Sequence, residues 1–194
     1  MLEKREAARR IGVLDQVAAI TTAGAVAVRA VEPQSRFVLR LAATEAARVG
    51  RVAGLNLAGS INRANVAQER TAARLGPDEW LLLAPAGDAA VLGDVIGEAL
   101  AGCHYTLVDI SHRNAAVEIS GPAAAAVLNA GCPLDLGLDK FKAGDATRTL
   151  FGKVEIVLLR LENVHGEPRY RIEFWRSFGR FLHAYLAEAT REFS

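Results

Sequence analysis

The strongest constraint on the fold is a repeated order of short apolar runs, each bounded by turn-forming residues. Both halves of the chain predict strand, strand, helix, strand, strand, helix, with one more strand in the second half. The halves share little sequence identity, so only the pattern is duplicated. This order indicates an α+β fold with mostly antiparallel sheets and helices packed on one face of each half. The expected strands lie at 25–31, 36–42, 70–75, 80–85, 104–110, 113–120, 147–151, 153–162 and 170–175, and the expected helices at 43–54, 88–100, 123–130 and 178–193.

A chain of 194 residues is long enough for one substantial domain, or for two small domains that share a core. We expect one compact two-lobed domain, with α+β halves at 25–102 and 103–194. Residues 1–24 alternate charged residues and alanine without a clean period, and we expect a mobile or loosely docked leader there. Residues 55–69 form a polar connection, which is the hardest part of the chain to predict.

Two turns are expected to join neighbouring strands into hairpins. Pro33 presets its own φ for a turn, so the apolar runs on either side of 32–35 are expected to pair. A tight turn at Ser111 and His112 is expected to join the first two strands of the second half.

Helix ends carry recognisable capping residues. Thr44 and Asp88 are expected N-caps, and Gly54 and Gly102 are expected stops. The last helix has the clearest period, with Ser177 as its expected cap, and each large apolar side chain buried there should contribute about 1.5–3 kcal/mol. Its apolar positions are Phe178, Phe181, Leu182, Tyr185, Leu186, Ala189 and Phe193.

Composition argues against several classes of function. Lys and Arg total 23 and Asp and Glu total 22, a net charge of +1, so no global field attracts a phosphate backbone and we expect no nucleic-acid binding. The longest apolar stretch, 80–102, carries three acidic residues, so we expect no membrane span. Two cysteines without a CxxC pair form no disulfide framework. A cytoplasmic protein with reduced thiols is therefore expected.

The stretch 109–136 holds the residue types of a catalytic constellation, namely Asp109, Ser111, His112 and Cys132. A cysteine nucleophile needs a base within hydrogen-bond reach and usually a third group that orients the base. However, Cys132 follows a helix end, so no helix N-terminus lowers its pKa. The favoured interpretation is a small buried thiol and a histidine on a turn, with a Cys/His enzyme as the alternative.

A zinc site at Cys103, His104, His112 and Cys132 is the other reading of these residues. Cys103 and His104 are adjacent on a strand, where successive side chains face opposite ways, so they are poorly placed to bind one metal ion. We therefore expect no metal site. His165, in a long hairpin loop, and His183, on the outer face of the last helix, are expected to be solvated.

No phosphate-binding signature is present, neither GxxxxGK[ST] nor a G-x-G-x-x-G after a strand. The chain thus gives no reason to expect a nucleotide or flavin of its own. The charged residues that remain are expected to be a solvated loop or edge-strand charges, with contact to a carboxylate of a partner chain as the alternative for the arginines. They are Asp139, Lys140, Lys142 and Asp145 in the loop, and Arg160, Arg171 and Arg176 on strands.

Several segments together resemble the gamma subunit family of heterotetrameric sarcosine oxidase. They cover about two-thirds of the chain in the expected order, whereas residues 1–35 and 55–69 carry no resemblance. The matching segments are LGPDEWLLLAP (75–85), VDISHRNAAVEISGPAAAAVLNAGCPLDL (108–136), the F-x-x-G-x-x-x-x-T run at Phe141–Thr149 with Arg148 inside it, EIVLLR (155–160) and FWRSFGRFLHAYLAEATREF (174–193).

The resemblance implies a fold similar to the folate-binding domain of the glycine-cleavage T-protein, which is itself a duplicated α+β unit. It also implies membership of a complex that oxidatively demethylates sarcosine to glycine, produces hydrogen peroxide and passes the one-carbon unit to tetrahydrofolate. In that family FAD, FMN, NAD, folate and zinc belong to the alpha, beta and delta chains, and the gamma chain packs chiefly against alpha. The acid and polar residues of the T-protein folate pocket have no counterpart motif here, so no catalytic, cofactor-binding or metal-binding residue is carried over.

Two functions follow from the resemblance and the residues. The first is a non-catalytic structural subunit of a sarcosine oxidase, which should expose an apolar patch when free of its partners. The alternative is a stand-alone folate-binding or folate-dependent one-carbon enzyme of the same fold.

Overall fold

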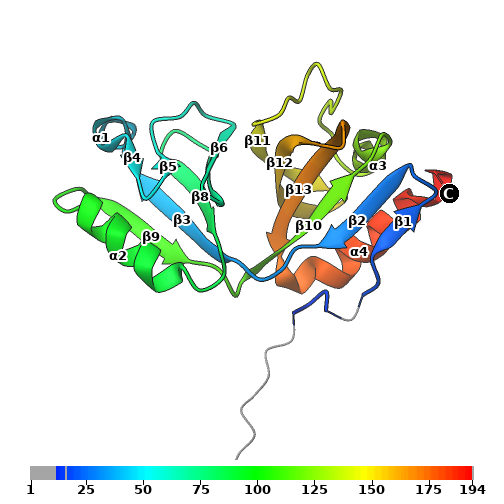
Figure 1. Cartoon of the computed structure of the whole chain (residues 1–194), viewed down its shortest axis with the longest axis horizontal. Coiled ribbons are helices and arrows are strands. Elements are labelled where there is room, and N and C mark those ends of the chain that lie inside the picture. The colour runs from blue at the N-terminus through cyan, green and yellow to red at the C-terminus, as the bar shows by residue number, and fades with distance from the viewer. Residues whose placement is uncertain (1–11, 16, 194) are drawn as a thin grey trace, which may run out of the picture.

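The computed structural model describes residues 12–15 and 17–193. Two antiparallel sheets stand side by side, and each carries helices on the face turned away from the other sheet (Figure 1). The α+β class with antiparallel sheets is therefore confirmed. The six-stranded sheet has the order β1 (Ile20–Thr22), β2 (Val26–Ala30), β10 (Asn114–Ser120), β13 (Glu167–Trp175), β12 (Val154–Val164), β11 (Ala146–Phe151). The five-stranded sheet has the order β6 (Arg63–Ala67), β7 (Arg70–Arg74), β8 (Glu79–Ala84), β3 (Ser35–Leu41), β9 (Tyr105–Asp109).

The α-helices in the described part of the chain cover the outer faces. Helices α1 (Ala43–Val49) and α2 (Ala89–Ala99) belong to the five-stranded unit, and α3 (Ala124–Asn129) and α4 (Gly179–Ala189) belong to the six-stranded unit. Short 3₁₀ turns, η1 (Arg176–Phe178) and η2 (Arg191–Phe193), flank α4. A small hairpin of β4 (Arg51–Val52) and β5 (Leu55–Asn56) follows α1.

The chain crosses between the two sheets twice, and neither expected hairpin forms. Residues 31–34 lead from β2 in one sheet to β3 in the other, and residues 110–113 lead from β9 back to β10. Strand β2 pairs with β10, and β9 pairs with β3. One unit therefore comprises residues 35–109, and the other comprises residues 20–30 together with 114–193. These units differ from the expected halves at 25–102 and 103–194. Turn residues set a bend in the backbone, but long-range pairing decides which strands meet.

Part of the expected leader belongs to the fold, although residues 1–11 and 16 of it lie outside the described residues. Strand β1 pairs with β2, with Ile20 opposite Val28. The Leu14 side chain is 6% exposed and packs in the core of the six-stranded unit. Burial of Leu14 stabilises the packing of this segment on the six-stranded unit. The alanine-rich sequence has no clear period from which that packing could be predicted.

Several expected helix ends and connections differ from the structure. The helix expected at 43–54 ends at Val49, because Gly50 takes a φ of 68° and reverses the chain. The connection expected at 55–69 contains β5 and β6. The N-cap positions of α1 and α4 are held by Ala42 and Phe178 and not by the expected Thr44 and Ser177. Asp88 lies at the N-cap of α2, as expected, but its side chain forms no capping hydrogen bond.

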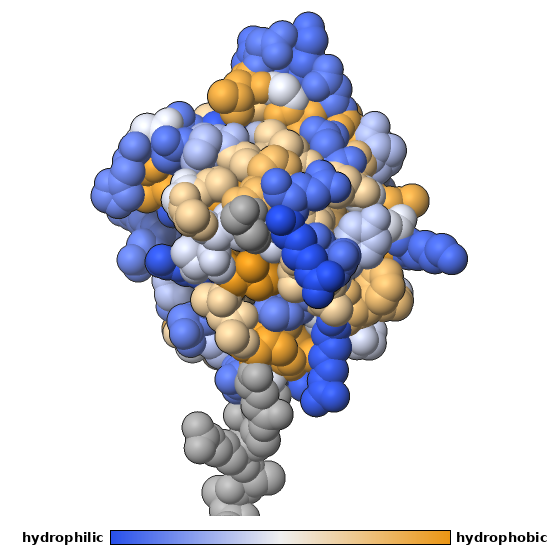
Figure 2. Space-filling view, turned by 90° about the vertical axis from the view of Figure 1, so that its right-hand side faces the viewer, coloured by the Kyte–Doolittle hydropathy of each residue, from blue (hydrophilic) through white to orange (hydrophobic). Residues whose placement is uncertain are grey.

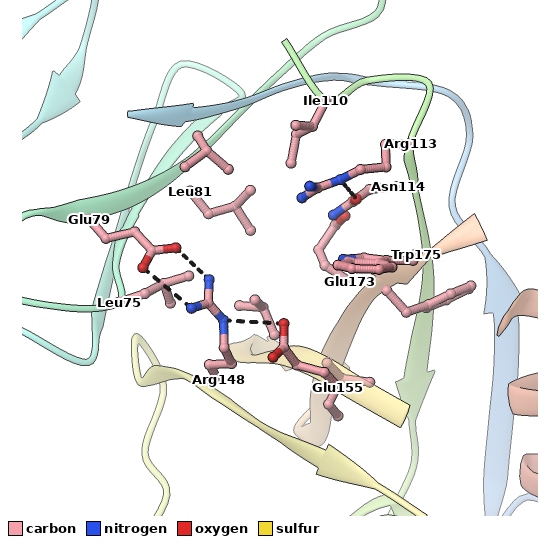
Figure 3. A pocket seen from close by; sticks show the side chains of 14 residues that line it. Leu75, Glu79, Leu81, Ile110, Arg113, Asn114, Arg148, Glu155, Glu173 and Trp175 are labelled. Carbon is pink, nitrogen blue, oxygen red and sulfur yellow. Dashed lines mark hydrogen bonds and ion pairs between the residues drawn. The ribbon is translucent and has the colours of Figure 1, made fainter. Parts of the chain in front are cut away.

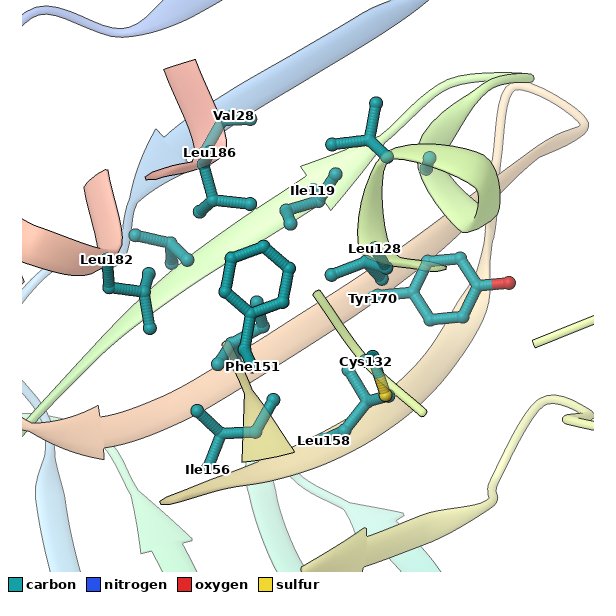
Figure 4. Close-up of a cluster of buried hydrophobic side chains, with 14 of the residues drawn as sticks. Val28, Ile119, Leu128, Cys132, Phe151, Ile156, Leu158, Tyr170, Leu182 and Leu186 are labelled. Carbon is teal, nitrogen blue, oxygen red and sulfur yellow. The ribbon is translucent and has the colours of Figure 1, made fainter. Parts of the chain in front are cut away.

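Three apolar clusters hold the units. One lies between the six-stranded sheet and its helices, with Phe151 in its middle (Figure 4). Its counterpart fills the five-stranded unit around the fully buried Trp80. A third, smaller cluster, which includes Leu81 and Leu159, lies between the inner faces of the two sheets. We call this contact between the inner faces the junction.

The last helix is only partly buried. Leu182 and Leu186 are fully buried, as the period predicted, but Phe178 and Phe181 are exposed, contrary to expectation. The end of the molecule with β1 and α4 accordingly mixes apolar and charged surface (Figure 2). Among the described residues, no helix combines the length and the apolar character that a bilayer span requires.

Candidate functional site

The second crossing segment is joined to the start of β3 by hydrogen bonds in the Asp109–His112 stretch. The Arg36 backbone N–H donates to Ser111 Oγ at 2.9 Å, and the Ile110 N–H donates to the Arg36 carbonyl at 2.8 Å. The Ser111 N–H in turn donates to Asp109 Oδ1 at 2.8 Å. These residues therefore fix the place where the chain passes between the sheets.

The electrostatics of Asp109 follow from the same hydrogen bonds. Its partial burial acts to raise the pKa of the carboxyl, but hydrogen bonds from the Ser111 side chain and backbone and the nearby His112 outweigh burial. The pKa of Asp109 consequently lies below its usual value, and the ionised form holds the turn.

A buried ionic cluster lies at the junction. The side chains of Arg36 and Glu173 are 2% and 0% exposed and are joined at 2.8 Å. Arg171, 8% exposed, donates from Nε to the other Glu173 oxygen at 2.9 Å, and it also bonds to Gln34. Because Glu173 accepts hydrogen bonds from two arginines, its buried charge is compensated.

A second ionic cluster lies farther along the junction. Arg148 from β11 donates to both oxygens of Glu79 from β8 and approaches Glu155 at 3.6 Å (Figure 3). Arg40 binds Glu79 at 2.8 Å. The hydrogen bond to Glu79 outweighs desolvation and raises the pKa of Arg148.

A third contact joins the facing edges of the two sheets. Asp145, before β11, pairs with Arg63 of β6 and accepts the Lys142 N–H at 2.6 Å. The Ala64 N–H also donates to the Gly144 carbonyl at 2.7 Å. Asp145 is therefore a contact between the units, and the expectation that it is merely part of a solvated loop is wrong.

A small pocket remains at the junction beside Arg148. It is lined by side chains of both sheets, among them Arg113, Asn114 and Trp175 (Figure 3). Its volume is about 30 Å³, room for a few water molecules at most, whereas sites for drug-sized ligands hold roughly 300–1,000 Å³. The facing charges are largely neutralised by one another, so the junction is built as a contact surface between the units.

The candidate nucleophile and base are placed in different environments. Cys132 is 4% exposed in the core of the six-stranded unit, with its sulfur 3.9 Å from Thr149 Oγ1. His112 lies exposed on the crossing segment, where its carbonyl accepts from Arg176 at 3.4 Å. The arrangement thus matches a core thiol and a turn histidine.

The other cysteine, Cys103, contacts polar side chains, in contrast to the core thiol of Cys132. Its thiol donates to Glu45 Oε2 at 3.1 Å, and Arg48 Nη2 lies 3.0 Å from the sulfur. The hydrogen bond to Glu45 raises the pKa of the thiol, which disfavours a nucleophilic thiolate. Within residues 12–15 and 17–193, no three His, Cys, Asp or Glu side chains gather as a set that could hold a metal ion.

Other charged residues also differ from expectation. Arg160 and Arg171 are buried on the inner strands β12 and β13, so they are not edge-strand charges. Arg160 lies 5.0 Å from the centre of the Tyr170 ring and binds Asn163. His183 contacts the Ala18 carbonyl at 3.0 Å instead of being only solvated.

The sequence of this chain matches one family over most of its length. A sequence model described as sarcosine oxidase, gamma subunit family, matches residues 41–192. The sarcosine oxidase subunit gamma of an Arthrobacter species is 33% identical over 143 residues, which are 72% of this chain and 70% of that protein. The subunit gamma of Corynebacterium sp. strain U-96 is 34% identical over 120 residues, 62% of this chain and 56% of that protein.

Solved structures with a similar fold extend the comparison. A chain of the heterotetrameric sarcosine oxidase from Corynebacterium sp. U-96, in complex with pyrrole 2-carboxylate, has a TM-score of 0.81 and 26% identity. The match covers 95% of this chain and 96% of that one. The glycine cleavage system aminomethyltransferase T from Bartonella henselae has a TM-score of 0.66 at 15% identity, covering 85% of this chain and 46% of that one. The second likeness is one of fold alone.

Proposed function

Because the chain belongs to the sarcosine oxidase gamma subunit family, we propose that it is a structural subunit of a heterotetrameric sarcosine oxidase without an active site of its own. The observation that carries this proposal is the match to a chain of such a complex over nearly the full length of both chains, at a TM-score of 0.81. The complex would demethylate sarcosine to glycine, produce hydrogen peroxide and pass the one-carbon unit to tetrahydrofolate.

The partners in this proposal are alpha, beta and delta subunits, chiefly alpha. FAD, FMN, NAD, tetrahydrofolate and zinc would belong to those chains, and the assembly would work in the cytoplasm. The junction residues do not fit a folate, because the pocket beside Arg148 has a volume of only about 30 Å³ and that arginine is already bound to Glu79. The proposal therefore assigns no folate-dependent step to this chain.

Co-expression with alpha, beta and delta subunits of a sarcosine oxidase tests the proposal. A tagged chain should retain them through purification, and the purified complex should oxidise sarcosine. Failure to co-purify at any salt concentration would refute the subunit role. Replacing the buried Cys132 by Ala should leave the activity of the assembled complex intact, whereas loss of activity from a correctly assembled complex would favour a cysteine enzyme.

The alternative is a folate-binding protein with the same T-protein-like fold. A titration distinguishes it from the structural subunit. Tetrahydrofolate added to the isolated chain should give no saturable signal at micromolar concentration. Saturable binding that weakens in the Arg148→Gln variant would instead place a folate site at the junction.

A further inference from the structure

Three aromatic side chains stay exposed where β13 passes into α4. Trp175, Phe178 and Phe181 are 46%, 38% and 48% exposed, and we refer to them as the aromatic surface. The Trp175 and Phe178 rings lie 6.4 Å apart, and Phe181 is one helical turn beyond Phe178. Exposed clusters of large apolar groups mark interaction sites, and aromatic residues dominate the energy of protein interfaces.

Arginines lie beside these aromatic residues along the chain, and another arginine contacts the surface directly. Arg113 stacks over Trp175 at 5.2 Å, and Arg176 and Arg180 alternate with the aromatic residues along the chain. No Asp or Glu occurs between residues 174 and 187. Charge complementarity therefore selects a partner that presents carboxylates around an apolar patch.

The exposed apolar residues of α2 provide the contrast. Val91 and Val95 are 61% and 37% exposed, similar to the aromatic surface. However, they share their helix with Asp94 and Glu98, and α2 carries no basic residue. A partner with an acidic rim is thus attracted to the aromatic surface and repelled by α2.

We propose that the aromatic surface is the docking site for another subunit of the sarcosine oxidase, which contributes an apolar patch rimmed by carboxylates. This inference rests on the proposed function and adds the surface and the chemistry of the partner. Trp175 and Arg113 also line the junction pocket, so the docked subunit would lie beside the segment 110–113, where the chain crosses between the sheets.

The test uses the full-length tagged chain co-expressed with the other subunits. In the Phe178→Ser/Phe181→Ser variant, the dissociation constant of the complex should rise at least about 30-fold, which corresponds to a hot-spot loss of about 2 kcal/mol. Arg180→Glu should also weaken binding and should reduce its dependence on salt. The matched control, Val91→Ser/Val95→Ser, should bind as the unchanged chain does. Circular dichroism and thermal unfolding of each isolated variant verify that it folds.

The possible outcomes are distinct. Folded aromatic-surface variants that bind like the unchanged chain would overturn this inference and leave the subunit role standing. Loss of binding in the α2 control alone would place the interface on α2 and would also overturn it. If the unchanged chain itself fails to co-purify, both proposals fall. If the variants only abolish self-association of the isolated chain, the occupant is a second copy and the inference is wrong.

Discussion

The Glu173 carboxylate accepts a hydrogen bond from Arg36 Nε at 2.8 Å, although 137 positions separate the two residues. Arg36 belongs to β3 of the five-stranded sheet, and Glu173 belongs to β13 of the six-stranded sheet. Both side chains are almost fully buried, and Arg171 completes the cluster. The two units are thus held together by compensated buried charge as well as by apolar contact.

Glu173→Gln should destabilise the chain strongly, because it keeps the shape of the side chain but leaves two buried arginines without a counter-charge. Breaking a buried ion pair on one side costs about 3–5 kcal/mol. The free energy of unfolding, measured in urea, should fall by that amount. Glu118→Gln on the adjacent strand is the control, since Glu118 is 32% exposed and lies 3.8 Å from Arg169, and it should cost under about 1 kcal/mol. Equal losses in the two variants would contradict the prediction.

Ser111→Ala should loosen the contact between the second crossing segment and the start of β3. The hydroxyl is the acceptor for the Arg36 backbone N–H at 2.9 Å, and an unsatisfied partly buried donor costs about 1–3 kcal/mol. The Arg36 amide should exchange its hydrogen faster, while the amide of Leu82 in the core of β8 should change less. Ser177→Ala, at an exposed position, should alter neither rate. Unchanged protection at Arg36 would show that Ser111 does not hold the crossing.

The pattern of apolar runs predicted most strands and helices because local periodicity decides which face of an element is buried. It could not predict which sheet each strand joins. The turns at Pro33 and Ser111 are compatible with a hairpin or with a crossing, and the choice depends on pairings such as Val28 with Ile119, far apart in the sequence. The topology therefore depends on pairing between strands far apart in the sequence, which the pattern within a short stretch of residues cannot predict.

The junction was missed for a related reason. Glu173 alternates with apolar residues along its strand, so it resembles the solvated face of an ordinary sheet. Arg36 and Glu79 lie at the starts of their strands, beside turn residues, where a charged side chain is usually solvated. One signal was available: the run Trp80–Leu83 is apolar without alternation, which indicates a strand buried on both faces. Such a strand requires a second layer over its inner face, and the second sheet provides it.

Asp109→Asn should make stability less dependent on pH in the acid range. The folded-state pKa of Asp109 is lowered, so its contribution is complete above the ordinary value of 3.8 and is lost as the pH falls through the folded-state value. The difference in unfolding free energy between the unchanged chain and the variant should therefore be constant well above pH 3.8 and should shrink as the pH falls below that value. Parallel urea titrations at several pH values measure it. A difference that grows on acidification would reverse the sign and refute the assignment.

Glu45→Gln should make Cys103 more reactive. The hydrogen bond to Glu45 is the main cause of the raised pKa of Cys103, whereas Arg48 favours the thiolate and remains in the variant. Alkylation by iodoacetamide at pH 8, followed by mass spectrometry of the peptide that contains Cys103, should be faster in the variant. Cys132 is an internal control, because its burial should keep it slow in both proteins. Equal rates at Cys103 would mean that the carboxylate does not control the thiol.

Deletion of residues 178–194 should prevent stable folding. The deletion removes α4, whose Leu182 and Leu186 side chains fill the core of the six-stranded unit beside Phe151. Leu186→Ala is the milder test and should cost about 2–5 kcal/mol, because it removes a fully buried side chain and leaves a cavity. Phe181→Ala, on the same helix but 48% exposed, should cost far less in the isolated chain. Soluble yield and melting temperature measure all three, and a truncated chain that stays soluble with an undiminished melting temperature would refute the role of α4 in the core.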